Sequence, residues 1–191
     1  MSEHAAPAAG RARARLRSPA AMVAVPQAVA ASLAQIRQVA RRIGQPARGE
    51  AVVAEIEGAL AAAAPPPGAP KLTAIVYQPN GFAAGAGTLT DEMLRRTGFE
   101  NVAARYGLGR WGNIGLEQII ADPPHVLLAG QPAPGAPTWA DRVLSHPALK
   151  RIGDRMQREA FPQRLLYCGG PVLIETAAAL ARARRNVLRA A

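Results

Sequence analysis

Residues 72–92, LTAIVYQPNGFAAGAGTLTDE, decide the fold class. The apolar run 72–77 predicts a buried strand, which a Pro-Asn-Gly breaker ends. A glycine-rich loop follows, and Thr88 opens a helix that we expect over 89–97. Strand, glycine loop and helix in this order form half of a βαβ unit. Because α/β proteins bind ligands beyond the carboxyl ends of their strands, this loop marks the expected working edge.

The rest of the chain alternates between strands and helices in the same way. Strands that are separated by helices, without hairpin turns, imply a parallel sheet covered on both faces. The expected fold class is therefore α/β, a Rossmann-like lobe with a parallel sheet flanked by helices. The further expected strands are 101–103, 126–129 and 164–167, and the further expected helices are 29–43, 48–64, 116–122 and a terminal helix from 169 onward.

A proline-rich segment, residues 64–70, gives the clearest boundary in the chain. Its sequence, APPPGAP, predicts a stiff linker. Residues 1–20 are rich in arginine and alanine without apolar periodicity, so we expect a disordered leader. The predicted organisation is a leader at 1–20, a helical connector and linker at 21–70, and an α/β ligand-binding lobe at 71–191.

The formal net charge of +10 raises the possibility of nucleic-acid binding. Only Lys71 and Lys150 are lysines, and most arginines are scattered along the predicted helices. The densest cluster is Arg11 to Arg17, within the leader. We expect no nucleic-acid partner, and a basic nucleic-acid-binding protein that works through this cluster is kept as an alternative.

Motifs for catalysis, metal binding and membrane insertion do not occur in the sequence. The single cysteine, Cys168, excludes an internal disulfide and a cysteine-based zinc site, and the three histidines lack metal-ligand spacing. Neither a G-x-S-x-G elbow nor an H-E-x-x-H helix is present. No apolar run reaches the roughly 18 residues needed to cross a bilayer. We therefore expect no catalytic residue, metal, cofactor or membrane insertion.

The Gly85-Ala86-Gly87 loop is the basis of a second alternative, a Rossmann-type nucleotide-dependent enzyme. A loop before a helix can hold a phosphate on free N–H groups. However, no lysine follows the glycines, and Thr90 stands at the third glycine position of a dinucleotide fingerprint.

Aromatic residues are scarce, at 4% of the chain, so their positions are informative. Trp111 and Trp139 lie in predicted loops, where a tryptophan offers a large flat contact to a bulky ligand. Tyr77, Asn80 and Phe82 belong to the glycine-loop edge. We expect these five side chains to face a ligand cleft.

Glu117 lies in the first turn of the short helix predicted at 116–122. The helix dipole stabilises a carboxylate in the first turn, so Glu117 can be interpreted as an ordinary first-turn acid. In a strongly basic chain it is also a candidate docking charge.

Three segments together resemble a known family. They are VYQPNGFAAGAGTLTDEMLRRTGFENVA at 76–103, IGLEQIIADPPHVLLAG at 114–130 and YCGGPVLIETAAAL at 167–180. From about Met22 to its end, the chain resembles the periplasmic substrate-binding proteins of iron-siderophore and cobalamin ABC transporters. The usual Pro-Asp before the second strand of that family reads Pro124-His125 here.

The resemblance implies a non-catalytic protein with two α/β lobes, joined by a long helix and closing over a ligand. This chain would supply the C-terminal lobe and the connecting helix, without the N-terminal lobe or a secretion signal. The implied ligand is a bulky metal chelate: a siderophore, haem or a corrinoid. Glu117 matches the glutamate with which that lobe docks on the membrane permease. The implied location is the periplasm, whereas the chain as written would stay in the cytoplasm.

Overall fold

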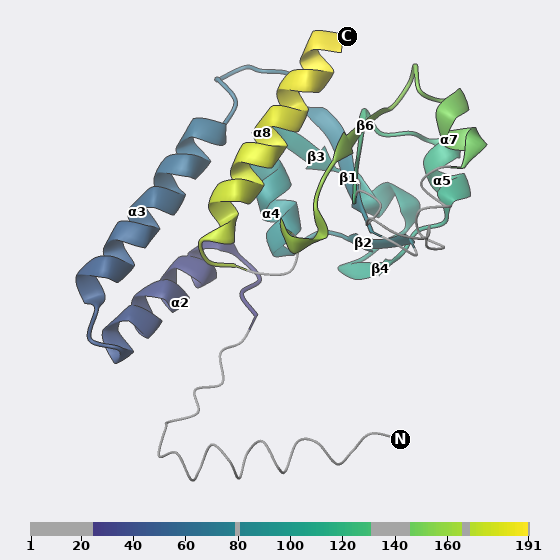
Figure 1. Ribbon diagram of the computed structural model, residues 1–191. Helices are drawn as coiled ribbons and strands as arrows, with labels where there is room; N and C mark the ends of the chain where they lie inside the picture. The colour runs from purple at the N-terminus through teal and green to yellow at the C-terminus, as the bar shows by residue number, and fades with distance from the viewer. Residues whose placement is uncertain (1–24, 79–80, 131–145, 166–168, 191) are drawn as a thin grey trace, which may run out of the picture.

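The computed structural model describes residues 25–78, 81–130, 146–165 and 169–190 of the chain (Figure 1). Helices and strands alternate along most of it, as expected for an α/β fold. The elements are α2 (Val29–Arg42), α3 (Pro46–Ala63), β1 (Leu72–Tyr77), β2 (Phe82–Ala84), α4 (Leu89–Arg96), β3 (Phe99–Asn101), η2 (Ala103–Tyr106), β4 (Trp111–Asn113), α5 (Leu116–Ala121), β5 (Val126–Ala129), α7 (Pro147–Arg151), β6 (Gln157–Ala160), η3 (Gln163–Leu165) and α8 (Val172–Ala190).

Four strands, in the order β3-β1-β5-β6, form a parallel sheet. Strand β1 is central, and all of its residues are buried. Its first half pairs with β3, and its last residue, Tyr77, pairs with Ala83 of the antiparallel strand β2. Strand β4 pairs in turn with β2. The parallel sheet is thus extended, beyond the carboxyl end of β1, by two short antiparallel strands.

Alternate side chains of β1 enter two separate hydrophobic cores. Ala74 and Val76 pack with residues of α2, α3, α4 and α8, whereas Ile75 and Tyr77 pack with residues of η2, α5 and α7. The two groups of helices lie on opposite sides of the sheet (Figure 1). The predicted parallel sheet with helices on both faces is therefore confirmed.

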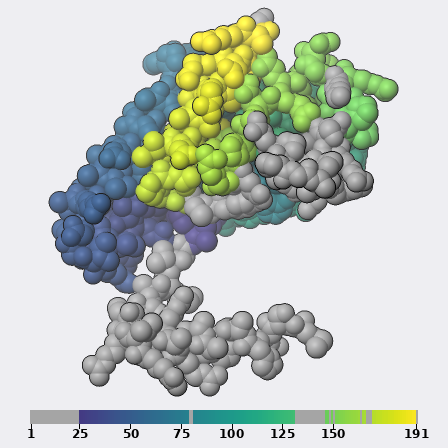
Figure 2. Space-filling model, viewed as in Figure 1, coloured from purple at the N-terminus to yellow at the C-terminus, as the bar shows by residue number. Residues whose placement is uncertain are grey.

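The helix pair α2–α3 shares its core with the sheet and with α8. In the space-filling view, α3 and α8 lie alongside each other at the surface (Figure 2). The segment after α3 is fastened to α8, because the Arg184 guanidinium donates to the carbonyl of Pro70 at 2.9 Å. The division of the chain at residue 70 stays a prediction.

Two sequence expectations about the sheet are wrong. The expected absence of hairpins fails because β1 pairs antiparallel with β2, the next strand along the chain, and Gly81 just before β2 has a positive φ of 79°. The last described strand is β6, not 164–167: Arg164 lies in the short helix η3, and residues 166 and 167 lie outside the described ranges. Strand β6 reads Gln-Arg-Glu-Ala, and such polar residues carry no apolar signal.

The extended piece expected at 101–103 is β3, which ends at Asn101 because Ala103 begins η2.

Two glycines of α3 give a matched test of the helix packing. A Cβ on Gly49 would overlap that of Ala40 in α2, whereas a Cβ on Gly58 meets no atom. We expect Gly49→Ala to lower the free energy of unfolding by roughly 1 kcal/mol, since overpacking costs about 1–3 kcal/mol and outweighs the gain in helix propensity. Gly58→Ala should raise it by about 0.5–1 kcal/mol. Urea unfolding followed by circular dichroism measures both, and equal stabilisation by the two variants would contradict the close packing.

Candidate functional site

The antiparallel extension of the sheet carries an exposed pair of stacked aromatic rings. The β2–β4 register places Phe82 opposite Asn113 and Ala84 opposite Trp111, so Phe82 and Trp111 are diagonal neighbours on one face. Their ring centroids are 5.7 Å apart and the rings are nearly parallel, with an interplanar angle of 8°. Phe82 is half-buried, and Trp111 is 43% exposed. This pair presents a flat apolar surface at the carboxyl edge of the sheet.

Tyr77 lies beneath this edge and holds it in place. Its side chain is 2% exposed, and its hydroxyl donates to the carbonyl of Ile114 at 3.1 Å. Ile114 in turn donates its N–H to the carbonyl of Gly81 at 2.9 Å. Burial raises the pKa of Tyr77, and the nearby Glu117 carboxylate adds to the rise. Tyr77 thus joins the end of β1 to the segment after β4. Its contact with a ligand stays a prediction.

Arg110 provides a positive charge next to Trp111. Its guanidinium donates to the side-chain oxygen of Gln27 at 3.2 Å and to the carbonyl of Gly87 at 3.3 Å. Both partners are neutral, and the arginine is exposed. The Arg110 carbonyl accepts from the N–H of Gly85 at 2.9 Å, and a Cβ on Gly85 would overlap the backbone just before Arg110. The glycine loop therefore permits the close approach that positions Arg110.

The glycine loop is closed by its own hydrogen bonds. The Thr88 hydroxyl donates to the carbonyl of Gly85 at 2.8 Å and accepts from the N–H of Asp91 at 3.1 Å, as expected for the cap of α4. The N–H of Gly87 donates to the Asp91 carboxylate at 3.2 Å. An incoming phosphate would meet this carboxylate, which argues against a nucleotide at the loop.

Glu117 is exposed in the first turn of α5. Gln118 supports that turn, since its side-chain oxygen accepts from the N–H of Gly115 at 3.0 Å. The other end of α5 is held by the hydroxyl of Tyr106, which donates to the carbonyl of Asp122 at 2.6 Å. Glu117 is thus an accessible carboxylate on a braced helix, and its docking role stays a prediction.

The structure brings together only part of the predicted site. Phe82 and Trp111 form the exposed stack, and Tyr77 supports it. Asn80 and Trp139 lie outside the described residues. Arg110 and Gln27 were not predicted as site residues. Arg110 directly precedes Trp111, so its position in the sequence could have indicated it. Gln27 is distant from the other site residues in the sequence, and no local pattern indicated it.

Metal binding and membrane crossing were also tested over the described part of the chain. Among those residues, no group of three or more His, Cys, Asp or Glu side chains is arranged to hold a metal ion. No described helix combines the length and apolar character of a membrane span.

Comparison with known proteins identifies the family. Residues 3–153 match the sequence model of the periplasmic binding protein family. The chain therefore belongs to this family, in agreement with the resemblance found in the sequence. A comparison with curated protein sequences gives no significant match.

Solved structures with the same fold include several solute-binding proteins. A possible iron-binding protein from Staphylococcus epidermidis superposes with a TM-score of 0.69 at 13% identity, covering 94% of this chain and 71% of that one. Helicobacter pylori CeuE with bound Ni(II) gives 0.66 at 19% identity, covering 87% and 55%. The periplasmic haem-binding protein RhuT from Roseiflexus sp. RS-1 gives 0.65 at 25% identity, covering 93% and 72%. This chain thus spans about half to three quarters of the length of these proteins.

The brace under α5 gives a pH-dependent prediction. Burial, and to a lesser extent the Asp122 charge, raise the pKa of Tyr106 to about 12, while Arg105 opposes this rise. An unfolded tyrosine titrates near pH 10. Because the folded pKa is the higher one, this stabilisation is fully present below about pH 10 and is lost as the pH rises through about 12. We expect the free energy of unfolding to fall between about pH 9 and about pH 11, and to fall less in Tyr106→Phe.

Urea unfolding at the two pH values measures this difference. Tyr77→Phe is the comparison: because burial also raises the pKa of Tyr77, this variant should lessen the fall as well, while the Tyr106 contribution stays in place. An identical pH dependence for the original chain and Tyr106→Phe would contradict the assignment.

Proposed function

We propose that this chain is the substrate-binding component of an ABC importer for a bulky metal chelate of the siderophore, haem or corrinoid type. The observation that carries this proposal is the exposed Phe82–Trp111 stack at the carboxyl edge of the sheet. Membership in a family of solute-binding proteins supports binding without catalysis. Neighbours with this fold include haem-binding proteins and a component of an Fe3+-hydroxamate transport system.

Binding rests on shape and charge. The two stacked rings offer a flat apolar contact of the kind that suits a planar or bulky ligand. Arg110 directly precedes Trp111 in the chain, and among the described residues its guanidinium donates to two neutral oxygens, so it favours a ligand with anionic groups. A second α/β lobe closes over the ligand from the other side. The proposed ligand contacts are Tyr77, Asn80, Phe82, Trp111 and Trp139, with Tyr77 acting from beneath.

Glu117 supplies the proposed contact with the permease. An exposed carboxylate can pair with an arginine of a membrane partner. The bracing of α5 by Tyr106 supports this role, because a rigid helix holds the charge in a fixed direction. In this arrangement the protein works in the periplasm, facing the permease.

The aromatic contact is tested by ligand titration. We expect Trp111→Ala to weaken binding of haemin or of ferrichrome about tenfold, whichever of the two the unaltered chain binds, because an aromatic contact contributes about 1 kcal/mol or more. Absorbance of the chelate reports binding. Leu188→Ala, which removes an exposed apolar side chain from α8, is the control. If Trp111→Ala and the control bind the chelate with equal affinity, Trp111 is not part of the site. If the unaltered chain binds neither haemin nor ferrichrome, the proposed function is wrong.

The docking contact is tested by uptake. Cells express the chain together with the permease from the organism that encodes it. They are supplied with the bound chelate loaded with radioactive iron. We expect Glu117→Ala to reduce uptake several-fold while leaving chelate binding in solution unchanged, since the lost pair lies at the permease. Glu55→Ala, at an exposed glutamate of α3, serves as the control. Equal uptake by the two variants would show that Glu117 is not a docking residue.

A further inference from the structure

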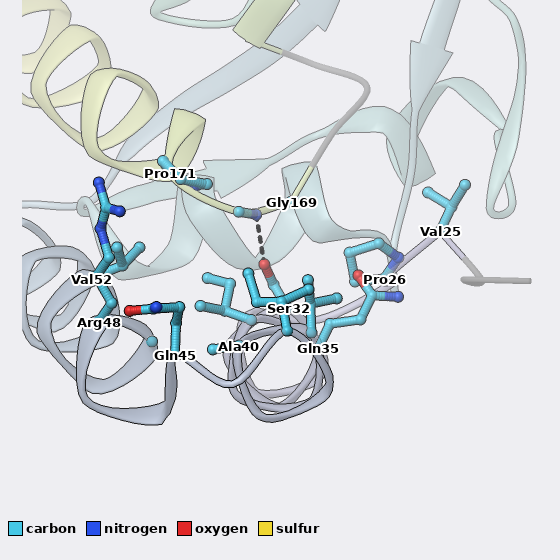
Figure 3. A pocket seen from close by; sticks show the side chains of 15 residues that line it. Val25, Pro26, Ser32, Gln35, Ala40, Gln45, Arg48, Val52, Gly169 and Pro171 are labelled. Atoms are coloured by element: carbon cyan, nitrogen blue, oxygen red, sulfur yellow. Dashed lines mark hydrogen bonds between the residues drawn. The ribbon is translucent and has the colours of Figure 1, made fainter. Parts of the chain in front are cut away.

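A second concave surface lies along α2. It is a groove of about 550 Å3 between α2, α3 and the start of α8 (Figure 3). This volume is within the range of about 300–1,000 Å3 that is typical of small-molecule sites. The groove residues are Val25, Pro26, Ser32, Gln35, Ile36, Val39, Ala40, Ile43, Gln45, Arg48, Gly49, Val52, Gly169, Gly170 and Pro171.

The floor of the groove is an apolar stripe of α2 that the protein leaves open. Helix α2 buries Val29 and Leu33 in the core beneath the sheet. A second stripe, along Ile36, Val39 and Ile43, lines the groove. Val39 is 44% exposed and Ile43 is 67% exposed. Contiguous exposed apolar surface of this kind marks a binding site more often than an accident of folding.

The closed end of the groove is fixed by a polar contact. The N–H of Gly170, which precedes α8, donates to the hydroxyl of the buried Ser32 at 2.6 Å, and Figure 3 shows this bond as a dashed line. This hydrogen bond joins α2 to the start of α8. The groove is therefore a built feature between three helices.

The charge at the groove is positive. Arg48 lines it, is exposed, and makes no hydrogen bond or ion pair among the described residues. It lies in the first turn of α3, which holds no acidic residue and has no side-chain cap. Arg41 and Arg42 end α2 at the same loop. The nearby Glu50 is already paired with Arg37 at 2.9 Å. An anion is therefore the complementary charge for this end of the groove.

We propose that the groove binds an amphiphilic carboxylate, with its aliphatic chain along the α2 stripe and its carboxylate at Arg48. The part of α2 that lines the groove, from Ser32 to Ile43, spans about 16 Å, at about 1.5 Å per helical residue. A second copy of the chain is disfavoured as the occupant, because it would bring Arg41, Arg42 and Arg48 against themselves. The leader is disfavoured for the same reason, since its Arg11–Arg17 cluster has the same sign.

Titration of the full chain with three ten-carbon probes tests this site. Decanoate, decanol and decyltrimethylammonium share the aliphatic chain and differ in the charge of the head group. Calorimetry, with all probes below the concentration at which they aggregate, gives the affinities. We expect decanoate to bind at least tenfold more tightly than decyltrimethylammonium, with decanol between them.

Two variants separate the apolar contact from the charge. Ile43→Glu, at a side chain that is already 67% exposed, should weaken decanol, whose neutral head group makes it the probe of the apolar contact, without unfolding the chain. Arg48→Gln should reduce decanoate affinity about tenfold and leave decanol unchanged. The matched controls on α8 are Leu188→Glu, at a residue 40% exposed, and Arg185→Gln, at an exposed arginine.

Equal affinity for decanoate and decyltrimethylammonium, or no binding of decanoate, would overturn the proposal. So would sedimentation that shows self-association through Ile43, because a second copy would then occupy the groove. Haemin and ferrichrome titrations of Ile43→Glu keep the two sites distinct: chelate binding should be unchanged there, so either site can fail without the other.

Discussion

Burial of strand β1 on both faces is the constraint on which the rest of the structure depends. Its residues alternate between two cores, so helices must cover the sheet on both sides. Both of its edges are also occupied, by β5 along one side and by β3 and then β2 along the other. Because β3 covers only the first half of β1, the second half is left for an antiparallel partner. The β2–β4 extension, and with it the Phe82–Trp111 stack, follows from this division of one edge.

Parts of the fold that depend on local apolar pattern could be predicted from the sequence. The strands 72–77 and 126–129 are found at those residues, because each is a continuous apolar run that must be buried. The helices expected at 29–43, 48–64, 89–97 and 116–122 are likewise found close to those bounds, as α2, α3, α4 and α5. In contrast, β6 was misplaced because it is a polar strand whose extended form comes from pairing with β5. The β1–β2 hairpin was missed because β2 has only three residues, Phe-Ala-Ala, and is too short to give a strand signal of its own.

The candidate site, like the fold, could be predicted from the sequence only in part. Phe82 and Trp111 were predicted from the scarcity of aromatic residues and their position near glycine loops. Their stacking could not be predicted, because it follows from the register of two short strands. Tyr77 was expected to face a ligand cleft, which stays a prediction; its hydroxyl donates to a carbonyl inside the edge, where a buried tyrosine is stable. Arg110 depends on Gln27, a partner 83 residues earlier in the chain, and no local pattern encodes such a contact.

The start of α2 links the ligand edge to the rest of the molecule. The side-chain oxygen of Gln27 accepts from Arg110, the residue before Trp111. The N–H of Val29 donates to the Glu92 carboxylate of α4 at 2.8 Å, and Ser32 accepts from the start of α8. Three separate elements therefore hold one helix end, and a rotation of α2 would have to break all three contacts. For this reason the helix pair α2–α3 is expected to move with the sheet as one body.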